Sequence, residues 1–369
     1  MKPMIVFIQN SPYLAGAEKC LFRLLTSTAL RSTFTTHMLI GKRGWLTRAC
    51  DDAAVAFTVM PFPSSRSLAG RIWGNRRFVS EASQVVHDKL VPSQPVVIHT
   101  NDHPDSLLGL ELARAMSCPS VLTLRTPGIS ERDFLKYRCH EHSALISVGE
   151  ELFDKVASWH QDTPHTLVHD GIGSDEIIMP RQPAADVVNQ VVVLGSLSPR
   201  KGWRDLIDAL VTMEQSGATD FPEFVFVGHH HGLDPATELG LSRLTRCQVR
   251  FVGVIQDFRE FVQDFPLAIH PSRSESFGMA AIETVAAGVP LLAGATGLIP
   301  AFIPSPQFLF EPSNLTDLVS KLKCLLGTSP GGLQQSFKLE TGQEIIARSF
   351  TLDRTVAQLT EIYDRLLKQ

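Results

Sequence analysis

Short apolar runs alternate with amphipathic segments along the first half of the chain. Residues 4–8 form an apolar run that ends in a polar loop, and apolar positions recur at helical spacing over 18–30. The same pair returns at 95–99 and 106–116. Such continuous apolar runs predict strands that helices cover on both faces, as in a parallel sheet. Further strands are expected at 121–124 and 144–148.

A turn-rich segment at 180–186 interrupts this alternation, which then starts again. The second series predicts strands at 190–194, 223–227, 249–252, 267–270 and 289–293, and helices at 203–213 and 278–287. The simplest interpretation is a linker near 176–189 between two doubly wound α/β domains, 1–178 and 188–349. Leu352, Val356, Leu359, Ile362, Tyr363, Leu366 and Leu367 then follow helical spacing, which predicts a final helix within 350–369 with Thr351 as its cap.

Doubly wound sheets bind ligands at the carboxyl ends of their strands. With two such domains, the expected site is a cleft between them. Candidate chemistry is therefore sought in the loops that follow the predicted strands.

Composition narrows the class of protein. The 369 residues are 44% hydrophobic and 20% charged, with 34 Lys and Arg against 38 Asp and Glu, which is ordinary for a globular chain and disfavours a nucleic-acid binder. The six cysteines are scattered, so neither a disulfide framework nor a zinc site is indicated, and reduced thiols in the cytoplasm are expected. The apolar run at 4–8 is too short for a signal peptide, and the mainly apolar stretch 289–303 is broken by Pro and Gly, so a soluble protein is expected.

Charge is distributed unevenly between the two halves. Residues 1–175 hold 18 basic and 17 acidic side chains, which leaves 16 and 21 for the rest. An anionic surface or partner is therefore more favourably placed at the first half.

The most informative chemistry lies in residues 268–283. A predicted strand ends at His270, a polar loop follows, and a helix begins near Gly278, with Glu275 in the loop and Glu283 inside the helix. The N–H groups that begin a helix form an anion site, and glycine lets a ligand approach the backbone closely. Two carboxylates beside a phosphate-binding helix start suit a nucleotide sugar, because they can accept hydrogen bonds from sugar and ribose hydroxyls. The alternative is a capped helix with surface charges.

The run PSRSESFGMAAIETVAAGVP resembles the signature of glycosyltransferase family 4, which are retaining enzymes of the GT-B fold. The resemblance implies two Rossmann-like domains facing across a cleft, with the last helix crossing back to the first domain. It implies that Glu275 contacts donor-sugar hydroxyls and that Glu283 contacts the ribose. The backbone of Phe277, Gly278 and Met279 would hold the diphosphate.

Residues 193–202 are similar to the family's G-R-L-x-x-x-K-G loop, which grips the donor diphosphate. Gly195 and Lys201 match that pattern, whereas Ser196 stands where the family usually has arginine. Arg200, next to the lysine, is expected to supply the missing charge. The alternative is a solvated basic pair at a helix start.

Three loops of the first domain also resemble the family. Gly16 and Ala17 are similar to a glycine-rich loop beneath the donor phosphates, or form a simple turn between strand and helix, where Glu18 favours the first helical turn. Residues 99–103 resemble an HxHD segment in which Asn101 replaces the second histidine. Asp102 and His103 would there bind hydroxyls or assist a proton transfer; a capped loop is an equal alternative. Arg125 falls where many relatives carry histidine, and we hypothesise that it binds a charged sugar or an acceptor phosphate.

Two further segments invite ligand hypotheses. His229, followed by His230 and His231, is expected to form part of the wall of the nucleotide pocket and not to bind a metal ion. Residues 66–78 mix basic with bulky apolar side chains, which fits a peripheral contact with an anionic membrane; a solvated helix with its apolar face in the core is the alternative.

These residues together predict a retaining, metal-independent glycosyltransferase without a cofactor. It would move a sugar from a nucleotide-diphosphate sugar to a glycan or lipid-linked saccharide of a cell-surface polysaccharide, in the cytoplasm or at the inner face of the cytoplasmic membrane. The alternatives are a GT-B sugar-nucleotide epimerase and a weakly active sugar-nucleotide-binding partner subunit. The base, the sugar and the acceptor stay open.

Overall fold

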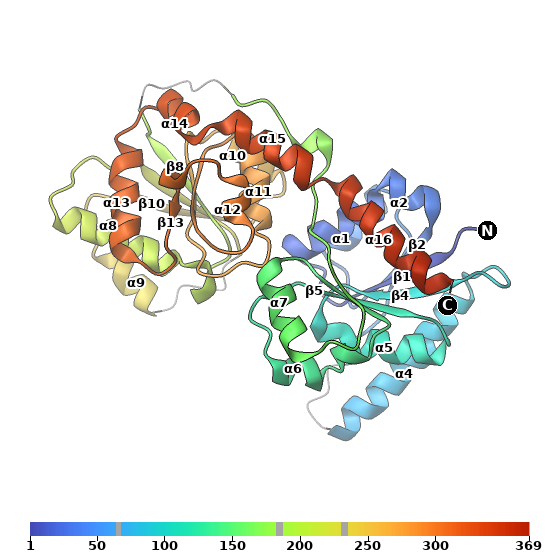
Figure 1. The fold of residues 1–369 in the computed structure, drawn as a ribbon. Helices are drawn as coiled ribbons and strands as arrows, with labels where there is room; N and C mark the ends of the chain where they lie inside the picture. The colour runs from blue at the N-terminus through green and yellow to red at the C-terminus, as the bar shows by residue number, and fades with distance from the viewer. Residues whose placement is uncertain (64–67, 182–186, 230–234, 369) are drawn as a thin grey trace. The chain divides into compact units, whose positions relative to one another are not determined.

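The apolar runs form two parallel sheets, each in its own compact unit (Figure 1). The computed structural model describes residues 1–63, 68–181, 187–229 and 235–368. Met1–Ile172 and Thr351–Gln369 make up the first unit, and Gly173–Phe350 the second. Both units are Rossmann-like, so the predicted fold class of two doubly wound α/β domains is confirmed.

The first sheet has the strand order β3-β2-β1-β4-β5-β6-β7, with all neighbours parallel. The order reverses direction between β1 and β4, which is where such sheets bind ligands. Its strands are β1 (Met4–Gln9), β2 (Thr35–Ile40), β3 (Phe57–Val59), β4 (Val96–Thr100), β5 (Ser120–Leu124), β6 (Ala144–Ser147) and β7 (His165–Leu167). Its helices are α1 (Gly16–Thr26), α2 (Thr28–Thr33), α3 (Trp45–Asp52), α4 (Leu68–His87), α5 (Ser106–Ala115), α6 (Glu131–Lys136), α7 (Glu150–Trp159) and α16 (Leu352–Leu367).

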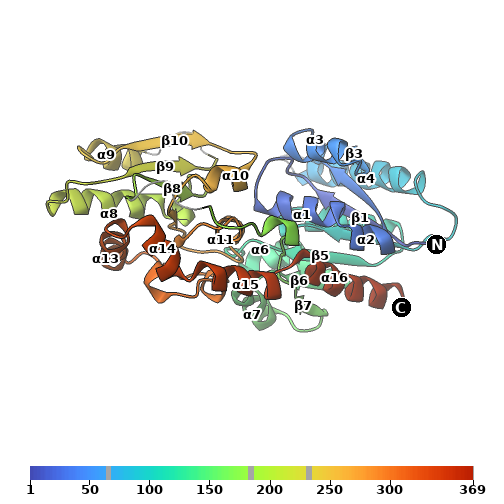
Figure 2. The ribbon, with the colours of Figure 1, turned by 90° about the horizontal axis from the view of Figure 1, so that it is seen from above.

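Strand alternation divides the first core between two faces. Ile5 and Phe7 pack with α1, α2, α3 and α16 on one face, whereas Val6 and Ile8 pack with α4 and α5 on the other. The terminal helix α16 lies beside α1 and α2 (Figure 1 and Figure 2). Thr351 caps it by accepting the Arg354 N–H.

One predicted helix is wrong. The segment 18–30 is not continuous, because Ser27 leaves the helical region at φ −58° and ψ 122°. Its hydroxyl accepts the Leu30 N–H, so the residue ends α1 and begins α2. A serine side chain that competes with the backbone for hydrogen bonds favours a helix cap over a helix interior.

The second sheet has the order β10-β9-β8-β11-β12-β13, and its direction reverses between β8 and β11. Its strands are β8 (Gln190–Leu194), β9 (Glu223–Val227), β10 (Val249–Gly253), β11 (Ala268–His270), β12 (Leu291–Gly294) and β13 (Leu309–Phe310). Its helices are α8 (Trp203–Gln215), α9 (Pro235–Ser242), α10 (Phe258–Val262), α11 (Met279–Ala286), α12 (Ile299–Phe302), α13 (Leu315–Leu326), α14 (Pro330–Phe337) and α15 (Leu339–Ser349).

The chain passes from the first unit to the second at Ile172, six residues before the predicted end of the first domain at 178. The segment after it is bonded to the second unit: the Ile178 N–H donates to the Ala286 carbonyl at 3.0 Å, and Gln343 Nε2 donates to the Ile178 carbonyl at 2.8 Å. Residues 182–186 of the predicted linker lie outside the described residues. Within the described chain, none of the helices is long and apolar enough to cross a membrane.

Candidate functional site

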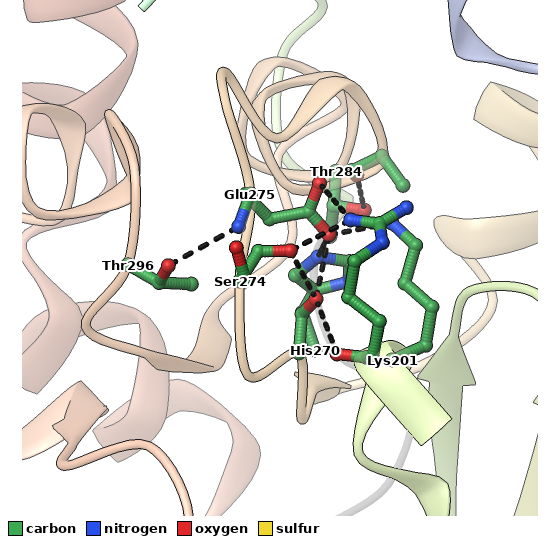
Figure 3. A network of polar contacts seen from close by, with 9 residues as sticks. Lys201, His270, Ser274, Glu275, Thr284 and Thr296 are labelled. Carbon is green, nitrogen blue, oxygen red and sulfur yellow. Dashed lines mark hydrogen bonds and ion pairs between the residues drawn. The ribbon is translucent and has the colours of Figure 1, made fainter. Parts of the chain in front are cut away.

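Glu275 is the centre of a buried polar network in the second unit (Figure 3). Its Oε1 atom lies 2.5 Å from Lys201 Nζ, 3.0 Å from His270 Nε2 and 2.7 Å from Ser272 Oγ. Its Oε2 atom lies 3.5 Å from Arg200 Nη1. The Glu275 N–H donates to Thr296 Oγ1 at 3.1 Å, which holds the backbone of the loop.

The network keeps Glu275 ionised. Burial by itself would raise the pKa of this carboxyl group, but Lys201, His270 and Arg200 hold the pKa far below its usual value. The neighbouring His270 is fully buried, and burial lowers its pKa although Glu275 acts in the opposite direction. A carboxylate and a neutral imidazole therefore stand side by side at the end of β11.

Two glycines bring the lysine loop to Glu275. Gly195 follows β8 at φ 119°, and Gly202 follows the short 3-10 helix η4 (Pro199–Lys201) at φ 66°. A Cβ atom at Gly202 would lie 1.8 Å from the Pro271 carbonyl oxygen, so only glycine lets this loop touch the loop after β11. The Arg273 N–H also donates to the Arg200 carbonyl at 2.8 Å.

Sequence reasoning missed Gly228, which follows β9 at φ 149°. A Cβ atom there would lie 2.0 Å from the Gly195 carbonyl oxygen, 2.4 Å from the Gly195 carbonyl carbon and 2.9 Å from Ser196 N. The signal was available, because a glycine directly after a predicted strand marks a close backbone approach.

Helix α11 begins beside this network. Gly278 is its N-cap at φ 95°, and a glycine has no side chain with which to cap the helix. The N–H groups of a first helical turn have no partner within the helix, so they present donors to an anion. The backbone of Phe277 and Met279 flanks this start. Both glutamates of the motif are buried, with Glu275 at 7% and Glu283 at 4% exposure, so the alternative of a helix with surface charges is wrong for them.

His229 is exposed, and its carbonyl oxygen accepts the Leu197 N–H at 2.8 Å. It thus joins the loop after β9 to the loop after β8. His230 and His231 lie outside the described residues. Over the part of the chain that is described, no group of three or more His, Cys, Asp or Glu side chains could hold a metal ion.

In the first unit, Arg125 pairs with Asp170, a residue that the sequence analysis did not single out. Arg125 Nη1 lies 2.5 Å from Asp170 Oδ2, and its Nε donates to the Asn101 carbonyl and side chain at 3.1 and 3.0 Å. The arginine side chain is only 9% exposed. Although burial disfavours the charge, Asp170 raises the pKa of Arg125. The positive charge of Arg125 is thus matched inside the unit.

Asp102 organises the loop after β4. It accepts the N–H groups of His103 at 2.8 Å and Arg125 at 3.1 Å, and the Thr126 hydroxyl at 2.8 Å. It is also the N-cap of the 3-10 helix η1 (His103–Asp105), and His103 Nδ1 lies 3.2 Å away. These contacts are those of a capped loop, one of the two interpretations of this segment.

The glycine-rich loop of the first unit joins the same edge of the sheet. Gly16 is the first residue of α1, and the Ala17 carbonyl accepts Asn101 Nδ2 at 3.3 Å. Gln9 Nε2 donates to the buried Glu18 at 3.1 Å, and Asn101 Nδ2 donates to Gln9 Oε1 at 2.7 Å. Glu18 is therefore part of a buried polar chain and does not simply favour a helix turn. Gln9 was missed, although a polar residue that ends an apolar strand was a visible signal.

The segment 66–78 is only partly described. Residues 64–67 lie outside the described residues, and α4 begins at Leu68. Trp73 is 71% exposed, whereas Phe78 is buried in the core. Arg77 pairs with Glu81 at 2.7 Å on the surface.

Comparison with known proteins relates the region that carries this geometry to a family model. Residues 174–338 match the family model described as Glycosyl transferases group 1. Among curated proteins, the chain is 40% identical over 326 residues to sulfoquinovosyl transferase SQD2 of Arabidopsis thaliana, covering 76% of this chain and 61% of that protein. It is 28% identical over 205 residues to D-inositol 3-phosphate glycosyltransferase of Jonesia denitrificans, covering 52% and 46%. The chain thus spans 46% and 61% of the lengths of these two curated relatives.

Solved structures extend the similarity to both units. Anabaena HepE in complex with UDP-glucose has a TM-score of 0.80 at 17% identity, covering 98% of this chain and 100% of that chain. Sucrose-phosphate synthase of Thermosynechococcus elongatus has a TM-score of 0.76 at 17% identity and covers 100% of both chains. The chain therefore has the GT-B fold, and the region that carries Lys201, Glu275 and α11 is similar to the glycosyl transferases of group 1.

Proposed function

We propose that this protein is a retaining glycosyltransferase of family 4 that moves a sugar from a nucleoside-diphosphate sugar to an acceptor. The observation that carries the proposal is Glu275, a buried carboxylate that Lys201 holds at 2.5 Å close to the start of α11 at Gly278, within the region that matches the family model. This arrangement offers a cation and backbone donors to a diphosphate, and a carboxylate to sugar hydroxyls.

Each group then has a task in the transfer. Lys201 and the N–H groups at Phe277, Gly278 and Met279 bind the diphosphate and stabilise the charge that develops as the bond from the anomeric carbon to the phosphate oxygen breaks. The acceptor hydroxyl forms the new bond on the same face, and its proton goes to the departing phosphate. Glu275 orients the sugar and Glu283 the ribose. No resident metal or other cofactor is required by this scheme.

Arg200 supplies the positive charge that the family usually has at the position of Ser196. Its side chain is 44% exposed, and its guanidinium lies near Glu275 Oε2. A second cation beside Lys201 supports diphosphate binding. Gly195 and His229 bring the loops after β8 and β9 together beside these groups.

Relatives suggest the probes for donor and acceptor. The similar Anabaena structure holds UDP-glucose, so a UDP-hexose is the first donor to test. The names of two curated relatives refer to D-inositol 3-phosphate and to phosphatidylinositol, which supports an anionic or lipid-linked acceptor. We propose that this acceptor binds to the first unit, near Gly16, Asp102 and His103. The transfer takes place at the inner face of the cytoplasmic membrane and contributes to the synthesis of a cell-surface polysaccharide.

A donor panel followed by two substitutions tests the proposal. UDP-, GDP-, ADP- and CMP-sugars are first compared by thermal shift, since a ligand at 100 times its Kd stabilises the fold by about 2.7 kcal/mol. Lys201→Met and Glu275→Gln are then expected to lower kcat for transfer about 100-fold or more, because both groups act on the transition state. Lys323→Met, an exposed lysine of α13, is the matched control.

The outcomes separate the alternatives. An epimerase would convert the donor without any acceptor, and a binding subunit would show a thermal shift without turnover. Either result, or normal transfer in Lys201→Met, would contradict the proposal. Retention is read from the anomeric configuration of the product, and chelation with EDTA checks that no metal is needed.

The anionic acceptor has its own test at Arg125. Because this residue pairs with buried Asp170, Arg125→Ala would leave an unpaired charge that costs about 3–5 kcal/mol. The double variant Arg125→Met with Asp170→Asn removes both charges and avoids that cost. If Arg125 binds the acceptor anion, KM for an anionic acceptor rises about tenfold while KM for the donor stays constant; an unchanged acceptor KM would refute the role.

A further inference from the structure

We propose that His270 is a positioning residue for Glu275: with Ser272 it fixes Oε1, so that Oε2 stays directed to a donor-sugar hydroxyl when Lys201 turns to the diphosphate. The inference rests on the proposed function and deepens it. It gives the two oxygens of one carboxylate different tasks.

The contacts of Glu275 are divided between these two oxygens. Oε1 accepts from Lys201, His270 and Ser272 at 2.5, 3.0 and 2.7 Å. Oε2 has Arg200 Nη1 at 3.5 Å, which is longer than a normal hydrogen bond. Arg200 Nη1 instead donates to the Ser274 carbonyl at 2.6 Å. Oε1 is therefore saturated with donors, and Oε2 retains the capacity to accept one from a ligand.

Within the described residues, the His270 ring makes one hydrogen bond, from Nε2 to Glu275. Its side chain is 1% exposed, and within the described chain its Nδ1 atom has no hydrogen-bond partner. A carboxylate oxygen only accepts, so Nε2 must carry the proton that it shares with Oε1. Leaving Nδ1 buried and unpartnered has a free-energy cost, and a phenylalanine would avoid it. The bond to Glu275 is what the histidine contributes in return.

The three donors on Oε1 differ in mobility. His270 lies in β11, which pairs with β8 and β12, and Ser272 follows two residues later. The His270 donor is thus fixed by the sheet, and Ser272 is fully buried. Lys201 has a flexible side chain on the loop between β8 and α8, and it is 15% exposed. Figure 3 shows Lys201 and His270 approaching Glu275 from two different segments. Lys201 can turn to a phosphate while the other two donors keep the carboxylate in place.

The test compares binding of UDP with binding of UDP-glucose, or of the nucleotide and sugar nucleotide that give the largest shift in the panel. In His270→Phe, the affinity for the free nucleotide is expected to stay within about twofold, because Lys201 and α11 are intact. The extra affinity that the sugar provides should be lost, and kcat should fall about 10- to 100-fold, the effect of a misplaced contact near the reacting atoms. His270→Gln, whose amide nitrogen reaches the position of Nε2, should restore most of both.

Thr284→Val is the matched control, because it removes one buried hydrogen bond, from Thr284 Oγ1 to the Ala280 carbonyl at 2.7 Å, in the same unit. It should lower thermal stability without changing the preference for the sugar nucleotide. The proposal is overturned if His270→Phe keeps the wild-type preference and kcat. It is also overturned if the Phe, Gln and Thr284 variants lose activity in parallel with their stability.

A measurement without nucleotide keeps this inference separate from the proposed function. Nitrogen NMR of histidine-labelled protein, with His270→Gln used for assignment, reports which ring nitrogen is protonated. The expected result is the Nε2–H form in the wild type and in Lys201→Met, with a changed signal in Glu275→Ala. An Nδ1–H form would overturn the positioning role even if the protein transfers sugar, whereas the Nε2–H form in a protein that binds no nucleotide sugar would contradict only the proposed function.

Discussion

Two carboxyl groups in this protein have pKa values that are shifted in opposite directions by their surroundings. Glu275 has three donors on one oxygen, and its pKa lies far below the usual range despite its burial. Asp105 is partly buried, and it accepts the Asn10 N–H at 2.9 Å. Burial, together with the nearby Asp102, raises the pKa of Asp105 to about 7. The number of hydrogen-bond donors, more than burial alone, decides whether a carboxyl group in these units is held in its ionised form.

Asp105→Asn is expected to stabilise the first unit, and more at pH 8 than at pH 5. The pKa of Asp105 is raised in the folded state from 3.8 to about 7, so at pH 8 the fold carries a charge that it disfavours, whereas at pH 5 the group is already neutral. We expect about 1–2 kcal/mol at pH 8, because the side chain keeps some contact with solvent. Urea unfolding at both pH values measures this; equal effects at pH 5 and pH 8 would contradict the raised pKa.

At the scale of elements, α16 is attached to the first sheet by a buried polar contact inside an apolar interface. Val356, Leu359 and Ile362 belong to the core that α1 and α2 share. Within it, the Tyr363 hydroxyl lies 2.5 Å from His99 Nδ1, and His99 Nε2 lies 2.7 Å from Thr123 Oγ1. One histidine therefore connects the last helix to β4 and β5.

Tyr363→Phe should weaken this attachment. It leaves one nitrogen of buried His99 without a partner, which costs about 1–3 kcal/mol of unfolding free energy. The exposed Tyr13, changed to Phe, is the control and should alter stability by less than about 0.5 kcal/mol. Denaturant unfolding gives both values, and similar small effects in the two variants would show that the packing of α16 alone holds it.

At the scale of the whole molecule, buried histidines set the response to acid. Burial lowers the pKa of His99 and His142 to about 3, and that of His37 and His165 to about 4; all four lie in the first unit. His270 in the second unit is shifted in the same direction. The folded protein therefore holds these rings neutral at pH values where an unfolded chain, with a pKa of 6.5, would protonate them.

Stability should consequently fall as the pH drops from 6.5 towards 4. Below pH 6.5 the unfolded state binds more protons than the native state, so each of these histidines removes about 1.4 kcal/mol per pH unit until its own folded pKa is reached. Because four of the five lie in the first unit, that unit should unfold first in acid. Fluorescence and amide exchange across this range measure both effects; constant stability between pH 7 and pH 5 would disprove the neutral, buried state of these rings.

Most strands can be predicted from the local pattern of apolar and polar residues. The elements that were not predicted have local causes as well. The predicted strands agree with β1, β4, β8 and β12 within two residues at each end, because each is an apolar run bounded by polar or turn residues. β2 was missed because it opens with the polar run Thr35-Thr36-His37. The division at Ser27 was missed because a serine cap inside an amphipathic pattern does not change its periodicity.

The sequence by itself determined the two parallel α/β units and the motif of residues 275–283, since strand and helix periods are local and since Glu275, Gly278 and Glu283 lie within nine residues of one another. Only the tertiary structure decided what those groups contact. Lys201 reaches Glu275 across 74 residues, and Arg125 finds Asp170 across 45. Such pairs arise where parallel strands end at one edge of a sheet, so they depend on strand order. His270 meets Glu275 locally, five residues along the chain, whereas Lys201 reaches the same carboxylate only because β8 and β11 pair side by side.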